Sequence, residues 1–126
     1  MIKPKIRDKI KSVGSTNRRK GHNYERTLVK EFKRIGYDKC TTSRYSSRIL
    51  DDCKIDLNIP DFNIQAKNVR SNINYKEIFQ DIESLLKEKL PERLEYISAI
   101  FHKRKNDEFV VLRKKDFYKL VLSYKT

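Results

Sequence analysis

The stretch from Lys54 to Lys67 constrains the fold of this chain more than any other. It is typical of two extended segments joined by a turn at Pro60-Asp61, because Pro and Asp are common turn residues. Side chains alternate between the faces of a strand, so Gln65 and Lys67 share one face of the second segment, and Asp56 lies on the first. The sequence therefore predicts a hairpin that gathers an acid, an amide oxygen and an ammonium group. Such a cluster can hold a divalent metal beside a phosphodiester.

Apolar periodicity predicts helices on both sides of this hairpin. Tyr24, Leu28, Phe32 and Ile35 follow helical spacing, and Gly36 stands where a helix commonly ends. A second helix is predicted from a cap at Asn74 to Leu90, before Pro91. Strands are expected at 39–43, 96–101 and 108–112, a polar loop at 44–54, and a last helix around 117–124. This order predicts an α/β domain with a small mixed central β-sheet flanked by helices.

Residues 1–20 are predicted to form a basic N-terminal arm before a compact domain of residues 21–126. The arm has eight basic residues and one acid, and so carries +7 of the formal net charge of +13. Apolar residues recur there at helical intervals, but three residues argue against a long stable helix: Pro4, Gly14 and Ser15. We expect an arm, with at most a short helix, that lies along a phosphate backbone or a partner subunit. A solvated tail without a defined site is an equally weighted alternative.

The overall charge favours a polyanionic partner. The 126 residues include 30 Lys and Arg against 17 Asp and Glu, so nucleic acid is the leading candidate and an anionic membrane surface the second. No apolar run approaches the roughly 20 residues that span a bilayer, and no signal peptide is recognisable. We therefore expect a soluble, cytoplasmic protein with no membrane partner. Cys40 and Cys53 fit no zinc pattern with His22 and His102, and reduced thiols are expected.

Glu25 falls in the first turn of the helix predicted around Tyr24, and it leans toward the buried side. One explanation is a favourable interaction with the helix N-terminus, worth about 0.3–1 kcal/mol. The other is a ligand to a metal or water under the helix. The sequence leaves both open.

Four short motifs in order carry a resemblance to a known family. They are Arg19-Lys20-Gly21, Tyr24-Glu25-Arg26, Lys54-Ile55-Asp56-Leu57 and Gln65-Ala66-Lys67-Asn68. Over residues 18–122 the chain resembles the PD-(D/E)XK nuclease superfamily, and within it the archaeal and phage Holliday-junction resolvases and the Mrr-type endonucleases. The resemblance implies a restriction-endonuclease-like fold and Mg²⁺-dependent cleavage of DNA, with Mn²⁺ as a substitute ion. It also implies branched DNA as substrate, a homodimer, and the host cytoplasm as the setting if the chain is phage-encoded.

The same resemblance implies roles for individual residues. Glu25 matches the helical acid of the family, Asp56 the metal-binding aspartate, and Lys67 the lysine that orients or activates the attacking water. Ala66 would offer its backbone carbonyl to the metal. Gln65 departs from the commoner Glu, although Mrr-type sequences also carry Gln there, and a neutral amide attracts Mg²⁺ less than a carboxylate does.

Other acids and His102 are alternatives for the site. Asp61 follows a proline, but Asp is common at turns, so Asp56 is the preferred metal ligand. Asp51 and Asp52 are accessory acids or solvated loop charges. His102 is expected to be a packed or exposed strand residue and not a general base.

Several polar and basic residues flank the proposed site or belong to its motifs, and could contact phosphates. They are Arg18, Arg19, Lys20, Arg44, Arg48, Lys54, Asn68, Arg70 and Lys76. The sequence contains no recognisable base-reading element, so recognition of DNA shape is expected. Two rival functions remain open: an Mrr-like endonuclease on linear or modified duplex DNA, and a DNA-binding or virion-associated protein that has the fold without turnover.

Overall fold

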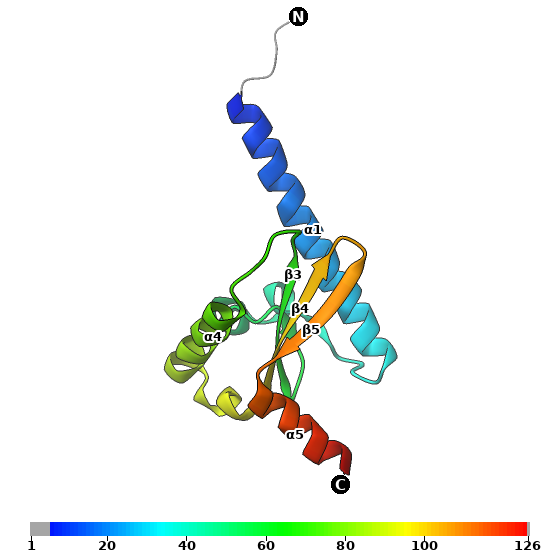
Figure 1. The fold of residues 1–126 in the computed structure, drawn as a ribbon, viewed down its shortest axis with the longest axis vertical. Helices are drawn as coiled ribbons and strands as arrows, with labels where there is room; N and C mark the ends of the chain where they lie inside the picture. The colour runs from blue at the N-terminus through cyan, green and yellow to red at the C-terminus, as the bar shows by residue number, and fades with distance from the viewer. Residues whose placement is uncertain (1–5, 126) are drawn as a thin grey trace, which may run out of the picture.

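The computed structural model describes residues 6–125, with side chains from residue 16 onward. Figure 1 shows the order of elements: α1 (Ile6–Arg34), β1 (Thr41–Thr42), α2 (Ser43–Ser46), α3 (Arg48–Asp52), β2 (Leu57–Asn58), β3 (Phe62–Asn68), α4 (Tyr75–Lys89), the 3-10 helix η1 (Pro91–Glu95), β4 (Ile97–Arg104), β5 (Asp107–Leu112) and α5 (Lys114–Lys125). The protein is a mixed α/β structure, as predicted. Among residues 6–125, no helix has the length and apolar character that crossing a membrane requires.

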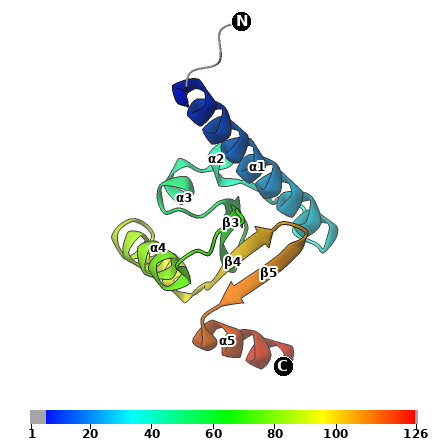
Figure 2. The ribbon, with the colours of Figure 1, turned by 45° about the horizontal axis from the view of Figure 1, so that its top comes forward.

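The main sheet has the order β3-β4-β5, with β3 parallel to β4 and β4 antiparallel to β5. A second, two-stranded sheet pairs β1 with β2. Figure 2 shows α1 and α4 on opposite sides of the main sheet and α5 beyond the end of β5. Ser98, Ala99 and Ile100 of the middle strand are buried, so the strand predicted at 96–101 is present and is covered on both faces. The small mixed sheet flanked by helices is therefore present.

Helix α1 is much longer than the sequence predicted. It runs for 29 residues from Ile6 to Arg34, so the expectation that the arm holds at most a short helix is wrong. Gly14 lies inside it, because a glycine costs only about 1 kcal/mol in a helix interior. The expected end is confirmed: Gly36 has φ 120°, and the Tyr37 amide donates to the Phe32 carbonyl at 2.9 Å. Pro4 lies outside the described residues.

The predicted hairpin is only partly formed. The chain does reverse at Pro60 and Asp61, where Asp61 has φ 71°, and the Asp56 amide donates to the Ile64 carbonyl at 2.8 Å. However, β2 pairs with β1 and β3 pairs with β4, so the two segments share no regular ladder. Asp56 itself precedes β2 and lies outside any strand. The predicted loop at 44–54 contains α2 and α3, whose buried Leu50 anchors it to the core.

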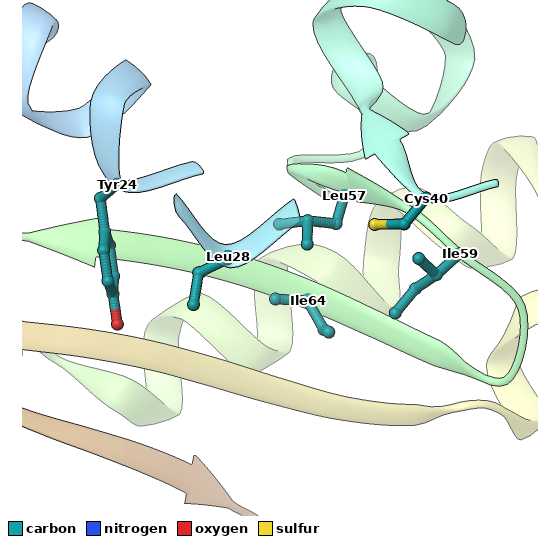
Figure 3. Close-up of a cluster of buried hydrophobic side chains, with 6 residues drawn as sticks. All are labelled: Tyr24, Leu28, Cys40, Leu57, Ile59 and Ile64. Atoms are coloured by element: carbon teal, nitrogen blue, oxygen red, sulfur yellow. The ribbon is translucent and has the colours of Figure 1, made fainter. Parts of the chain in front are cut away.

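The core consists of two apolar clusters, one on each side of Asp56. The first, drawn in Figure 3, joins α1 to β2 and β3 and contains Tyr24, Leu28, Cys40, Leu57, Ile59 and Ile64. The second joins α3 to α4 and contains Leu50, Cys53, Ile55, Ile82 and Leu86. Ile55 enters one cluster and Leu57 the other, and both are fully buried. Asp56 is therefore held at the junction by its two neighbours. Both cysteines are buried free thiols.

Helix α4 matches its prediction closely. The Asn74 side chain accepts a hydrogen bond from the Glu77 amide at 3.1 Å, which is the expected N-cap, and the helix ends at Lys89 before Pro91.

His102 is 1% exposed. Its Nε2 lies 3.0 Å from the Val69 carbonyl and its Nδ1 3.0 Å from the Tyr75 hydroxyl. Since a carbonyl only accepts, Nε2 carries the proton and donates to Val69. His102 is thus a packed strand residue, as predicted.

Candidate functional site

One pocket of about 430 Å³ contains every residue for which the sequence predicted a catalytic or metal-binding role. Those five are Glu25 from α1, Asp56, and the consecutive Gln65, Ala66 and Lys67 of β3. The remaining lining residues are Asp51, Lys54, Ile78 and Asp81. We call this the carboxylate pocket. Its walls come from α1, α3, the Asp56 segment, β3 and α4.

Asp56 is fixed by three hydrogen bonds. Its amide bonds to Ile64, its carbonyl accepts from the Ser43 amide at 2.8 Å, and its Oδ2 accepts from the Ala66 amide at 2.7 Å. The carboxylate is thereby tied to the strand that carries Gln65 and Lys67. Its position does not depend on a regular ladder.

The pKa of Asp56 is raised to about 7. Burial is the main cause, because it disfavours the charged carboxylate. The nearby Glu25 raises the pKa further through its charge and a hydrogen bond, whereas the Ala66 amide and the Lys67 charge lower it. A carboxyl that resists ionisation in the free protein is one that a cation would stabilise in its charged form.

Gln65 lines this pocket and carries a buried side-chain oxygen. The residue is 6% exposed, and its Nε2 donates to the Lys54 carbonyl at 3.1 Å. This bond fixes which end of the amide is the oxygen. The Lys54 carbonyl that accepts this bond belongs to a residue with φ 63°, which is uncommon for a residue other than glycine. Oε1 has no hydrogen-bond partner among the described residues. Because an unpaired buried acceptor costs about 1–3 kcal/mol, this atom is a candidate ligand for a cation.

Glu25 is 7% exposed, and its Oε2 lies 3.3 Å from Nη2 of Arg44. Glu25 stands deep inside the 29-residue α1 and not in its first turn, so an interaction with the helix N-terminus cannot explain its burial. The contact also changes the expectation for Arg44: the guanidinium is paired with an acid of the pocket. Lys54 is likewise paired, with Oδ2 of Asp81 at 3.2 Å.

The donor set fits a hard divalent cation. Four carboxyl groups and two lysines line the pocket, together with the free oxygen of Gln65. Within the side chains that the structure describes, no three Asp, Glu, His or Cys groups converge into a metal cage. Mg²⁺ commonly takes one or two carboxylates and keeps several waters, so it does not need such a cage. Asp56, the Gln65 oxygen and the Ala66 carbonyl are the groups that would hold it.

The other acidic residues that the sequence offered as alternatives differ in their position relative to the carboxylate pocket. Asp61 lies at the turn and does not line the pocket, which supports the preference for Asp56. Asp51 lines the pocket, and Asp52 is exposed outside it. Asp81 was missed by sequence reasoning. Its position three residues after Ile78 on the apolar face of α4 is the signal that could have found it.

The predicted phosphate-contacting residues lie in several places. Lys20, Asn68 and Arg70 line a second cavity of about 640 Å³. Arg44 lines a separate hollow with Arg26, and Arg48 and Lys76 are exposed on α3 and α4. Arg18 and Arg19 lie on the exposed surface of α1. Lys103 and Lys105, which also line the second cavity, were not predicted.

No protein-family model, curated protein or solved structure matches this chain.

Proposed function

We propose that the protein is a metal-dependent endodeoxyribonuclease with a restriction-endonuclease-like fold that hydrolyses phosphodiester bonds at branched DNA such as a Holliday junction. The observation that carries the proposal is the meeting of Asp56, Gln65, Ala66 and Lys67 in one pocket, with Oε1 of Gln65 unpaired. The proposed setting is the cytoplasm, that of the host if the chain is phage-encoded.

The residues divide the chemistry between them. Mg²⁺, or Mn²⁺ in its place, would polarise the scissile phosphate and lower the pKa of a bound water. Asp56, the Gln65 oxygen and the Ala66 carbonyl would hold the ion. Lys67 is positioned beside Asp56, where its ammonium group can orient the attacking water and offset charge that develops on the phosphate. Glu25 would hold a water or the ion from the α1 side. Arg44 restrains the Glu25 carboxylate.

DNA is the proposed partner because the net charge of +13 attracts a polyanion, while four of the 17 acids line one pocket. A nuclease needs this combination, since a surface of cations alone binds phosphates but supplies no site for a metal. Linear or modified duplex is the rival substrate. A silent DNA-binding protein is the rival of another class, and it is favoured by one observation: an amide stands at position 65 where a carboxylate would hold Mg²⁺ more strongly.

The test uses purified full-length protein with an end-labelled four-way junction and a linear duplex of matched sequence, each with Mg²⁺ or with EDTA. We expect Mg²⁺-dependent nicks in the junction and much slower cutting of the duplex. Equal cutting of both substrates would favour the Mrr-like rival. Binding without cleavage of either substrate, with Mg²⁺ or Mn²⁺, would overturn the nuclease proposal and favour the silent binding protein.

We also propose that the protein is a homodimer joined through β5 and α5. Seven of the ten large apolar side chains exposed in the described residues lie on these two elements: Phe109, Val110, Phe117, Tyr118, Val121, Leu122 and Tyr124. β5 is also one of the two edge strands of the main sheet, so it offers unpaired backbone groups. The strand begins with two acids, Asp107 and Glu108, and is followed by Lys114 and Lys115. Antiparallel pairing with a second copy therefore brings opposite charges together.

Val110→Lys, which places a charge in the middle of this surface, should convert a dimer to a monomer in sedimentation analysis. Val110 is 56% exposed, so the substitution should leave the fold intact. Ile35→Lys is the matched control, because Ile35 is 72% exposed just after α1 and outside the β5–α5 surface. A monomeric wild type, or a dimer that survives Val110→Lys, would contradict the proposed interface.

A further inference from the structure

A second cavity, of about 640 Å³, lies between three segments that are distant in the sequence. Lys20 comes from α1, Asn68 and Arg70 from the end of β3 and the loop after it, and Lys103 and Lys105 from the end of β4 and the turn before β5. We call this cavity the basic cleft.

The charge of the basic cleft is the reverse of that of the carboxylate pocket. Four of its nine lining residues are Lys or Arg, none is acidic, and the others include three asparagines and Ser71. Ammonium, guanidinium and amide groups are donors that match phosphate oxygens. Among the lining residues nothing would repel an anion, so a negatively charged backbone is the ligand that this chemistry fits.

The cleft is built from restrained backbone. His102 holds the start of the β3–α4 loop through the Val69 carbonyl, and Nη1 of Arg104 donates to Oδ1 of Asn72 at 2.9 Å further along it. The Asn74 cap fixes the end of the same loop. On the opposite wall, Lys105 has φ 59° at the tip of the β4–β5 turn. Gly or Asn adopts this conformation more easily than lysine does.

The basic cleft and the carboxylate pocket are both lined by residues of α1 and β3. Lys67 lines the pocket and Asn68, the next residue of β3, lines the cleft. A DNA strand with its scissile phosphate at Asp56 could therefore run along β3. Its neighbouring phosphates would then pass Asn68 toward Lys20 and Lys105. Arg44 offers phosphates less, because its guanidinium already pairs with Glu25 at 3.3 Å.

We infer that the basic cleft binds the backbone phosphates next to the scissile bond, and that it fixes the register of the nucleic acid without reading bases. The inference rests on the proposed function for the identity of the strand. The cleft itself is defined by its own residues, and its binding can be measured without metal or cleavage.

The experiment measures binding of a fluorescent four-way junction by full-length protein in EDTA at several salt concentrations. Lys20→Gln with Lys105→Asn removes two charges, and Asn tolerates the backbone of position 105. Lys39→Gln with Lys89→Gln is the matched control, because these exposed lysines lie outside both the cleft and the β5–α5 surface. We expect the cleft variant to bind at least about tenfold more weakly, with a salt slope reduced by about 2, and the control to change much less.

Equal losses in the two variants would overturn the inference, since binding would then depend on total charge alone. Arg70→Gln, in an exposed loop, gives an independent single-site test if the double variant is unstable. The two proposals can fail separately. If the protein never cuts DNA but its binding depends on the cleft, the cleft proposal holds and the nuclease proposal fails. If the protein cuts DNA and the cleft variant binds as well as the wild type, only the cleft proposal fails.

Discussion

Asp56→Asn should reduce junction cleavage in Mg²⁺ by about a thousandfold or more while DNA binding in EDTA stays near that of the wild type. The amide can still accept the hydrogen bond from the Ala66 amide, so the local geometry is kept and only the charge is lost. A metal contributes several kcal/mol to a phosphoryl-transfer transition state, and each 1.36 kcal/mol is a factor of ten. Lys67→Ala should have an effect of similar size because it removes the ammonium group beside that charge. Single-turnover cleavage at saturating protein measures both.

Asp52→Asn is the control for this pair. Asp52 is an exposed acid four residues before Asp56 and does not line the carboxylate pocket, so the same chemical change there should alter cleavage less than about threefold, as expected for surface substitutions. If Asp56→Asn cut as fast as the wild type, Asp56 would not be the metal ligand. If both variants at Asp56 and Asp52 lost activity equally, the loss would reflect the net charge of this segment and not the pocket.

The sequence predicted which residues meet in the carboxylate pocket better than it predicted how the surrounding strands pair. Asp56 and Gln65 were placed together because a turn at Pro60-Asp61 must reverse the chain, and this consequence holds whether or not a ladder forms. The predicted pairing of the two segments with each other was wrong because strand pairing depends on distant segments. β3 pairs with β4, and β2 pairs with β1. Apolar alternation in a short segment indicates which residues are buried, but not which strand lies beside them.

The length of α1 was missed for a different reason. Gly14 and Ser15 are weak helix formers, yet their cost is small against a helix whose second half is anchored by Tyr24 and Leu28 in the core. This error misplaced Glu25, which appeared to lie in a first turn and was given a helix-terminus explanation as an alternative. The basic cleft was missed because Lys103 and Lys105 meet Lys20 only through the fold. Residues more than 80 positions apart leave no local signal of their proximity.

Metal binding should depend on pH around neutrality because of Asp56. Its pKa of about 7 lies above the ordinary value of 3.8, so the protonated form is the one that folding favours. Without metal, the stability that this group provides is full below about pH 4 and is lost as the pH rises toward and through 7. Mg²⁺ competes with that proton. The melting temperature gained from Mg²⁺ should therefore be larger at pH 8 than at pH 6, and Asp56→Asn should remove the difference.

Gln65 decides whether the pocket is a working metal site. Gln65→Leu removes the unpaired oxygen with little change in volume, so it should shrink the Mg²⁺-induced rise in melting temperature at pH 8. Gln65→Glu should enlarge that rise and keep or increase cleavage, because a carboxylate attracts the ion more strongly than an amide.

The Glu variant also loses the hydrogen bond from Nε2 to the Lys54 carbonyl, so its metal-free stability should fall by about 1–3 kcal/mol. The informative quantity is thus the rise on adding metal and not the starting temperature. A wild type with no rise and no cleavage, beside an active Gln65→Glu, would mean that the amide marks a site that has lost its metal, which is the silent binding protein. Equal rises in the wild type and Gln65→Leu would instead place Gln65 outside the coordination of the ion, and the unpaired oxygen would need another ligand.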